Sequence, residues 1–564
     1  MSEIIVGIDL GTSTTEAAVI RDGKPVMLLN LEGEISTPSA VGIDDAGNFV
    51  IGEKARAQYM LSPERTAIEI KRHMGTEDKI GLGRQEYTPI DLSARLLEYV
   101  KTYVSEAMEE EISRAVISVP AYFDDIQRQA TVFAGQRAGF RVERILNEPT
   151  AAALSYGLEH LEEESHILVY DLGGGTFDVT LLEMFDGVRE VKASSGDNKL
   201  GGKDFDEKLM DYLAERFQKK YSVDLRSDVY ASVRLKEEAE QCKKSLSTEE
   251  SYHVLVPMIV EKDGSPLALD ENVTREEFEE LCAELLERTH VPMDVVLEDA
   301  DISTEDIDQV ILVGGSTRMP CVSKDIEKYL GIVPQRSVNP DFAVAEGAAI
   351  QAGIIEGSIR TEDSIIMTDV NPYTLGVRCL HEFTDDYMSV IIPRNVTIPT
   401  SRTETYYTSS DDQSVAAIEV YQGESSYASS NHFLGKFNVT GIPKKPAGAE
   451  QIQVEFTYNL NGMLEVRASI VSTGKEAGIR IDMMHEEAEE EKDLSGWKDV
   501  PEAKAFRTVV RRAEKRMKAA EKNGEEDLKK SLEISLNLLK TALLDGKISH
   551  AESIGEELLG LLED

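Results

Sequence analysis

A pattern that occurs twice constrains the fold of this chain more than any other feature. Each copy is an apolar run followed by Asp-Leu-Gly, a few small or hydroxyl residues and a second β-rich run, and the copies span residues 4–20 and 167–182. Because the residues after the glycines favour strands, we expect each copy to be a hairpin. Two such hairpins that face each other would clamp the phosphates of one nucleotide.

The turns of the two hairpins carry groups that suit phosphate. Glycine in a turn lets backbone N–H groups approach phosphate oxygens closely, and hydroxyl side chains add donors. The residues concerned are Thr12, Ser13, Thr14, Gly173, Gly174, Gly175 and Thr176. The chain has no GxxxxGK(S/T) pattern, and its glycines lead into a strand rather than a helix, so P-loop and dinucleotide-binding sites are disfavoured.

The two hairpins also carry a pair of carboxylates. Asp9 and Asp171 each end an apolar run and point toward the same turn. Without compensation these charges would repel phosphate. Hydrated Mg²⁺ between carboxylates and phosphate removes this conflict, because Mg²⁺ keeps several waters and takes few protein oxygens. We therefore expect a magnesium-nucleotide site.

The net charge excludes some partners. The chain has 60 Lys and Arg against 104 Asp and Glu, a formal charge of −44, so nucleic acid and anionic membranes are disfavoured. The four cysteines are Cys242, Cys282, Cys321 and Cys379, too sparse for a disulfide framework or a zinc pattern. With no signal peptide and no run of 18 apolar residues, we expect a cytoplasmic protein with reduced thiols.

The sequence changes character along the chain, which predicts several domains. Residues 1–362 alternate β-rich runs with helical patterns, as α/β domains do. Residues 363–369 form an apolar linker, which we expect to dock in at least one state because linkers normally face water. Residues 370–485 read as an antiparallel β-sandwich, and residues 486–564 as charged helices.

Two periodicities support the last two assignments. Ile452, Val454 and Phe456 alternate with polar residues before a turn at Asn461 and Gly462. The helical region carries two apolar stripes, which are Phe506, Val509, Val510, Ala513 and Met517, and then Leu528, Leu532, Leu536, Leu539 and Leu543. The stripes are most simply packing surfaces of a small bundle, and the alternative is a helix that binds a partner.

Six further segments accompany the hairpins. They are 68–75 (IEIKRHMG), 118–123 (SVPAYF), 145–154 (ILNEPTAAAL), 200–206 (LGGKDFD), 310–320 (VILVGGSTRMP) and 339–341 (NPD). With them, residues 1 to about 482 resemble the seventy-kilodalton heat-shock chaperones of the DnaK type. The resemblance implies an actin-like α/β ATPase domain of two lobes, a β-sandwich that binds peptide, and a short α-helical lid.

The resemblance assigns catalytic and metal-binding roles. Catalysis would rest on Lys71, Glu148, Asp171, Thr176 and Asp178. Lys71 would lie by the γ-phosphate and position the attacking water. Asp9, Glu148 and Asp171 would hold hydrated Mg²⁺, and Asp178 would help with water or with K⁺.

The resemblance also assigns a site for ATP and ADP. Contacts to phosphate would come from Asp9, Gly11, Thr12, Ser13, Gly173, Gly174, Gly175, Thr176, Gly201 and Gly202. Contacts to adenosine would come from Glu240, Lys243, Ser247, Gly314, Gly315, Ser316, Arg318 and Asp341. Glu240, Lys243 and Ser247 share one helix face, a pattern that a solvated charged face would give as well.

A peptide site and its control are implied in the same way. The peptide-binding residues would be Val377, Leu380, Tyr406, Ser409, Ala416 and Ile418. The alternative is that these residues belong to the core of the sandwich. The allosteric residues would be Pro120, Arg128, Ile365, Ile366 and Asp369. Partners would be unfolded apolar segments, a J-domain co-chaperone and a nucleotide exchange factor.

Several departures leave alternatives open. Tyr406 stands where the family has Phe, and Ala416 replaces a larger residue, which affects peptide preference. The helical region is shorter than the family's lid and tail. An actin-like kinase for a small molecule would share the hairpins but not the linker and sandwich. A non-catalytic exchange factor or scaffold would not need Lys71 and the carboxylates.

Overall fold

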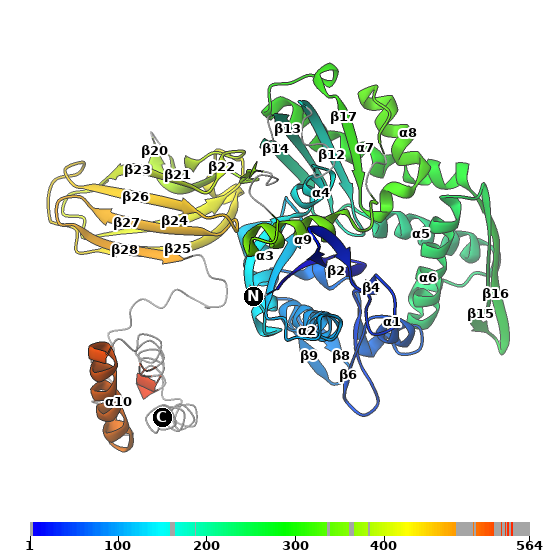
Figure 1. The fold of residues 1–564 in the computed structure, drawn as a ribbon, viewed down its shortest axis with the longest axis horizontal. Coiled ribbons are helices and arrows are strands. Elements are labelled where there is room, and N and C mark those ends of the chain that lie inside the picture. Colours follow the sequence, from blue (N-terminus) through cyan, green and yellow to red (C-terminus); the bar gives the residue numbers. More distant parts are fainter. Residues whose placement is uncertain are drawn as a thin grey trace. The chain divides into compact units, whose positions relative to one another are not determined.

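The computed structural model describes residues 4–157, 164–185, 188–335, 339–359, 366–381, 384–480, 500 and 503–523, with positions 532, 536, 539, 540, 543 and 544. The chain forms two compact units, Met1–Met483 and Met484–Asp564 (Figure 1). The finer boundaries expected within the first unit stay predictions. No helix in the described part of the chain is long and apolar enough to cross a membrane.

The first sheet of the α/β region has the order β11-β10-β1-β2-β3, and β4 pairs with β2 at its side. Its strands are β1 (Ile5–Leu10), β2 (Thr14–Arg21), β3 (Lys24–Met27), β4 (Thr37–Pro38), β10 (Arg114–Val119) and β11 (Arg141–Asn147). β1 runs parallel to β10 and antiparallel to β2. The first copy of the repeated pattern is therefore the predicted hairpin.

The second sheet repeats this arrangement in the order β17-β12-β13-β14-β18. Its strands are β12 (Ser165–Leu172), β13 (Phe177–Phe185), β14 (Val188–Asp197), β17 (Gln309–Val313) and β18 (Ile366–Met367). β12 runs parallel to β17 and antiparallel to β13, so the second copy is also a hairpin. Leu168 and Tyr170 pack into one core and Ile167 and Val169 into another, as expected for a sheet covered on both faces.

Helices cover both sheets. They are α1 (Glu53–Tyr59), α2 (Pro89–Met108), α3 (Asp125–Arg137), α4 (Glu148–Gly157), α5 (Gly202–Tyr221), α6 (Val229–Leu246), α7 (Arg275–Asp299), α8 (Pro320–Leu330) and α9 (Ala343–Glu356). α9 packs on β1, β2 and β10, α4 packs on β12, and α4 and α9 contact each other. This pair therefore joins the two sheets through one shared core.

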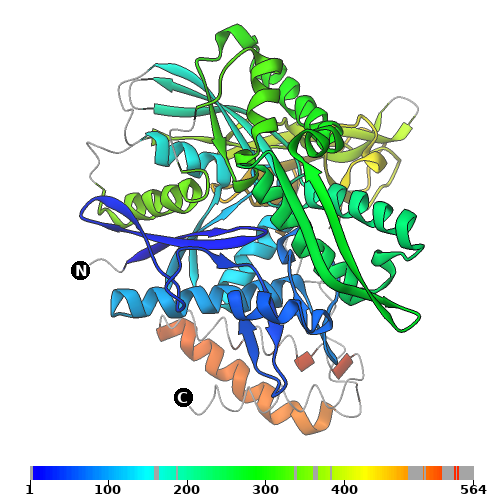
Figure 2. The same cartoon turned by 90° about the vertical axis from the view of Figure 1, so that its right-hand side faces the viewer.

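A three-stranded sheet, β6-β5-β7, and two strand pairs, β8-β9 and β15-β16, complete the α/β region. Their strands are β5 (Val41–Ile43), β6 (Phe49–Ile51), β7 (Thr66–Ala67), β8 (Ile80–Leu82), β9 (Gln85–Tyr87), β15 (Ser251–Lys262) and β16 (Ser265–Thr274). The β15–β16 ribbon packs along α6, and Figure 2 shows the length of this ribbon. α1 packs on β5, β6 and β7.

The sandwich has two antiparallel sheets, β21-β20-β24-β25 and β23-β26-β27-β28. The strands are β20 (Leu375–His381), β21 (Thr384–Ile392), β23 (Thr400–Tyr407), β24 (Val415–Gln422), β25 (His432–Thr440), β26 (Gln451–Tyr458), β27 (Leu464–Ile470) and β28 (Lys475–Arg480). Ile452, Val454 and Phe456 are buried between the sheets, which confirms the period-two prediction for β26. A further short antiparallel pair joins β19 (Asp369–Val370), which precedes the sandwich strands in the chain, to β22 (Thr397–Ile398), which lies between β21 and β23.

The sandwich contacts the α/β region through the loop between β26 and β27. The Leu464 N–H donates to Asp125 (2.9 Å), and the Ile145 N–H donates to Asn461 Oδ1 (3.1 Å). Burial raises the pKa of Asp125 to about 7. Ile126, next to Asp125, packs into the sandwich core. The first turn of α3 and the strand β11 therefore both hold this loop, through the Leu464 backbone and the Asn461 side chain.

The described residues of the second unit include a packed apolar cluster. α10 (Ala503–Asn523) buries Phe506, Val510 and Ala513 against Leu532, Leu536, Leu539 and Leu543. Val509 and Met517 are half-buried at the edge of this cluster. Both predicted stripes therefore serve packing, and Leu528 lies outside the described residues.

Candidate functional site

A cavity of about 560 Å³ lies where the two hairpin turns meet. The turns touch each other, since a Cβ atom on Gly174 would lie 2.3 Å from Ser13 Oγ. The predicted residues that line the cavity are Asp9, Gly11, Thr12, Ser13, Thr14, Lys71, Glu148, Asp171, Gly173, Gly174, Thr176, Gly202, Glu240, Lys243, Ser247, Gly314, Gly315, Ser316, Arg318 and Asp341. Residues far apart in sequence thus surround one space, as the facing-hairpin hypothesis requires.

Three predicted site residues lie behind the lining. Gly175 and Gly201 are in backbone contact, because a Cβ atom on Gly201 would lie 2.4 Å from the Gly175 nitrogen. Asp178, on β13, is buried and accepts a hydrogen bond from the Tyr122 N–H (2.9 Å). These residues support the cavity wall rather than face the space directly.

Lys71 is the cation at the centre of a group of carboxylates. It lies in a 3₁₀ turn (Ile70–His73) and its side chain is 6% exposed. Its Nζ forms an ion pair with Glu148, the first residue of α4. A buried lysine needs such a partner, since an unpaired buried charge is strongly unfavourable.

The carboxylates outnumber this cation. Burial raises the pKa of Asp9 to about 7, with Glu148 adding to the rise and Lys71 opposing it. Burial and Glu148 likewise raise the pKa of Asp178 to about 7. The pKa of Asp171 is also raised, by burial and by the charges of Glu148, Asp178 and Asp9. Ionisation of all these carboxylates is therefore unfavourable unless a further cation is present.

This excess charge fits a bound cation. No group of three His, Cys, Asp or Glu side chains in the described part of the chain is placed to hold a bare metal ion. A hydrated Mg²⁺ remains compatible, because its waters span longer distances to carboxylates. Asp9, Glu148 and Asp171 are the residues whose charges such an ion would relieve.

The start of α5 fixes the second hairpin turn. The Gly202 and Lys203 N–H groups donate to the Gly173 and Gly174 carbonyls (both 2.9 Å). The Ser316 hydroxyl donates to the same Gly173 carbonyl (2.8 Å). Three hydrogen bonds thus fix the turn at the cavity wall.

The far end of the cavity carries the residues expected to bind adenosine. Glu240 and Lys243 are buried on α6, and Ser247 follows the helix. Arg318 forms an ion pair with Asp341 (2.5 Å) between the segment after β17 and the segment before α9. The shared helix face of α6 therefore lines the site rather than facing solvent.

Among the predicted allosteric residues, Asp369 is the one that lies against β11 and α4. Asp369 is buried and accepts hydrogen bonds from Asn147 Nδ2 (2.8 Å) and Thr150 Oγ1 (3.2 Å). The backbone of Ile366 pairs with Val188 as β18 joins the second sheet. Ile365 lies outside the described residues, as does the side chain of Ile366.

Pro120 and Arg128 lie at the start of α3. Pro120 is buried in the segment between β10 and α3, and its carbonyl accepts from the Phe123 N–H (3.2 Å). Arg128 is buried and donates to the Ala121 (2.8 Å) and Phe123 (3.1 Å) carbonyls. Its side chain also packs against Gly462 in the β26–β27 loop of the sandwich. Arg128 therefore contacts the sandwich directly.

The predicted peptide-binding residues divide by exposure. Val377 and Ile418 are buried in the sandwich core, and Tyr406 and Ala416 are half-buried against it. Leu380 is 61% exposed and Ser409 is also exposed. The Tyr406 hydroxyl donates to Ser389 Oγ (2.9 Å), a bond that joins β23 to β21. Peptide binding by these residues stays a prediction.

Several cavity residues carried no assignment from sequence. They are Glu16, Ser36, Arg56, Lys203, Lys244, Thr248, Val313, Met319, Pro340 and Val344. Lys203, Val313, Met319 and Pro340 lie inside the motifs quoted above, so their positions alone gave a signal. Arg56 lies on α1 and gave none, because its place depends on how α1 approaches α6.

A family model described as Hsp70 protein matches residues 5–81 and 78–559 of the chain. The match covers nearly the whole sequence, and the chain therefore belongs to the Hsp70 family. Members of this family are chaperones and ATPases that bind ATP and ADP with Mg²⁺.

The contact between Gly201 and Gly175 generates a prediction. A Cβ atom at position 201 would lie 2.4 Å and 2.6 Å from backbone atoms of Gly175, so Gly201→Ala must displace the second hairpin turn. We expect ADP affinity, measured by calorimetry, to fall by an order of magnitude or more. Gly81→Ala is the control, because a Cβ atom there meets nothing within 4 Å. Unchanged affinity in a folded Gly201→Ala protein would contradict the role of the turn.

Proposed function

We propose that this protein is an ATP-driven chaperone that binds exposed apolar segments of unfolded proteins and releases them in a cycle of ATP binding and hydrolysis. The observation that carries the proposal is the single cavity that gathers both hairpin turns, Lys71 and the carboxylates. Membership of the Hsp70 family supports the same class of activity.

The nucleotide would lie with its phosphates between the two hairpin turns. Backbone N–H groups and the hydroxyls of Thr12, Ser13 and Thr176 would cradle the phosphates. Glu240, Lys243 and Ser247 would contact the ribose and adenine. Mg²⁺, held through its waters by Asp9, Glu148 and Asp171, would neutralise phosphate charge.

Hydrolysis would depend on Lys71. An ammonium group beside the γ-phosphate stabilises the charge that develops in the transition state and orients the attacking water. Glu148 keeps Lys71 in place through their ion pair. Asp178, held by a hydrogen bond from the Tyr122 N–H, would help to order water or K⁺.

Two short segments would couple the nucleotide site to the sandwich. Glu148 lies in the site, while its neighbours Asn147 and Thr150 bind Asp369 of the linker. Tyr122 binds Asp178 through its N–H, and its carbonyl accepts from the Tyr373 hydroxyl (2.8 Å) before the sandwich. A shift at the phosphates would therefore reach the linker within a few residues.

Coupling of this kind is reciprocal. ATP can favour the docked linker only if it binds that state better, and peptide must then alter ATP turnover. The docked linker strand β18 and the fixed β26–β27 loop support a state in which the sandwich releases peptide readily. The helical unit would act as a short lid. A J-domain protein and an exchange factor would stimulate hydrolysis and ADP release.

The test is ATP turnover with Mg²⁺ and K⁺, with and without an unfolded apolar peptide. The proposal expects slow release of phosphate to water and faster release with peptide. Transfer of phosphate to a small molecule would contradict the proposal and indicate a kinase. Absence of ATP turnover with retained nucleotide binding would contradict the proposal and indicate an exchange factor or scaffold.

The same assay applies to Lys71→Ala. We expect hydrolysis to fall by about 100-fold or more, because one transition-state contact is removed, while ADP affinity stays nearly unchanged. Lys219→Ala, at a lysine whose side chain is 78% exposed, is the control. An equal loss of affinity and rate would assign Lys71 to binding rather than to catalysis.

Asp369→Ala tests the coupling. The change removes the acceptor of Asn147 and Thr150, so we expect basal ATP turnover to persist and stimulation by peptide to disappear. Asp385→Ala in the sandwich, where the side chain is 83% exposed, is the matched control. Full peptide stimulation in Asp369→Ala would rule out the linker as the route of coupling.

A further inference from the structure

Lys203 is a largely buried lysine in the cavity wall to which the sequence assigned no role. It is the second residue of α5, and its N–H donates to the Gly174 carbonyl (2.9 Å). Its side chain is 9% exposed and lines both the main cavity and a small cavity beside it. A lysine in this position requires carboxylate partners, since burial of its charge is otherwise costly.

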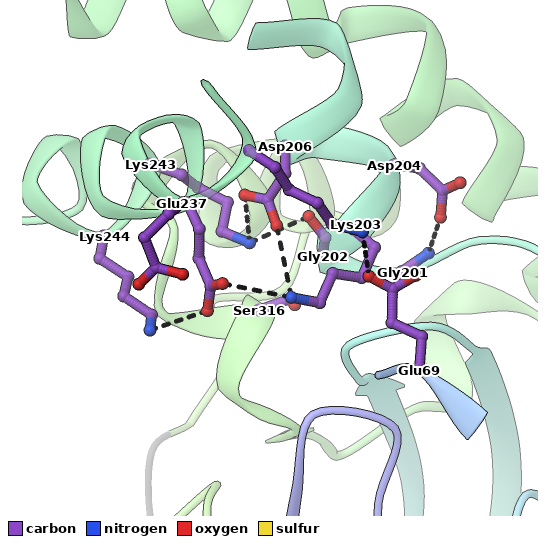
Figure 3. Close-up of polar contacts among 12 residues, drawn as sticks. Glu69, Gly201, Gly202, Lys203, Asp204, Asp206, Glu237, Lys243, Lys244 and Ser316 are labelled. Carbon is purple, nitrogen blue, oxygen red and sulfur yellow. Dashed lines mark hydrogen bonds and ion pairs between the residues drawn. The ribbon is translucent and has the colours of Figure 1, made fainter. Parts of the chain in front are cut away.

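The first of these partners is Asp206. Its side chain is 1% exposed and lies between two lysines, with Lys243 Nζ 2.8 Å from Oδ1 and Lys203 Nζ 4.0 Å from Oδ2 (Figure 3). Burial raises the pKa of Asp206, and the two lysines oppose that rise. Asp206 therefore serves as the shared counter-ion that holds both lysines at the cavity.

The second partner is Glu240. Lys203 Nζ lies 3.2 Å from Glu240 Oε2, which also accepts from Arg56 (2.8 Å), while Lys244 binds Oε1 (2.8 Å). Burial acts to raise the pKa of Glu240, but these three cations hold it well below its usual range, and the charge of Lys203 is the largest single contribution that lowers it. Glu240 is thus a fixed, fully ionised acceptor.

The three cations differ in how well water screens them. The side chain of Lys203 is 9% exposed, against 27% for Arg56 and 58% for Lys244. A buried charge acts more strongly on its partner than an exposed one, because the surrounding dielectric constant is lower. A carboxylate has about four lone-pair positions, so Glu240 keeps room for a further donor besides these three.

We infer that Lys203 is a positioning residue for the ribose. It holds Glu240 ionised and oriented so that the free lone pair of this carboxylate accepts a hydrogen bond from a ribose hydroxyl of the bound nucleotide. Lys203 thereby sets nucleotide affinity through Glu240 and leaves the phosphate chemistry to Lys71. The inference rests on the proposed function only in that it requires adenine nucleotide in this cavity.

The experiment compares ADP with 2′,3′-dideoxy-ADP, which lacks the hydroxyls that Glu240 would accept from. Calorimetry on the full chain is expected to show ADP binding about 10-fold more weakly in Lys203→Ala. The dideoxy nucleotide, which already lacks this bond, is expected to lose much less. Lys203→Arg keeps the charge and should restore most of the preference for ADP.

Lys208→Ala is the matched control, because Lys208 also lies on α5 in an ion pair, with Glu284 (3.1 Å), outside the main cavity. It should leave both affinities unchanged. Equal losses for ADP and the dideoxy nucleotide would place Lys203 on the phosphates and overturn the inference, as would an unchanged ADP affinity in Lys203→Ala. If the unaltered protein binds no ADP, the proposed function fails instead.

Discussion

The ion pair between Lys71 and Glu148 is the interaction on which the rest of the structure depends. Glu148 opens α4, and α4 joins the two sheets through its contact with α9. Its chain neighbours Asn147 and Thr150 hold Asp369 of the linker, so the site and the linker are joined by four consecutive residues, 147–150. Because consecutive residues have few soft torsions between them, neither end can move far without the other.

Electrostatics explains why such a junction would respond to nucleotide. Asp9, Asp171 and Asp178 all have raised pKa values because they are buried and lie near the charge of Glu148, while Lys71 opposes the rise. A bound cation would favour the ionised forms of these carboxylates. The adenosine end differs, since Glu240 is already surrounded by Lys203, Arg56 and Lys244. One end of the cavity thus holds carboxylates with raised pKa values, and the other holds a carboxylate already paired with three cations.

The features that the sequence predicted are those with local signals. Both hairpins followed from strand-forming residues on each side of a glycine turn, and the sandwich strand at Ile452 followed from period-two alternation. The approach of Arg56 and Lys203 to Glu240 could not be predicted, because it depends on how α1, α5 and α6 meet. Asp178 was expected in the site, yet it lies behind the wall and bonds to Tyr122, a contact set by the fold between β10 and α3. Some of the residues expected to bind peptide are buried in the sandwich core. The sequence pattern alone therefore does not distinguish core packing from peptide binding at these positions.

The most direct test of the account is hydrogen exchange at the backbone amides that dock the linker and the sandwich. The Thr368 N–H donates to the Arg189 carbonyl (3.1 Å), and the Leu464 N–H donates to Asp125 (2.9 Å). If the junction at Glu148 couples nucleotide to docking, both amides should exchange more slowly with a non-hydrolysable ATP analogue than with ADP. Equal exchange at both amides in the two nucleotide states, with both nucleotides bound, would contradict the coupling.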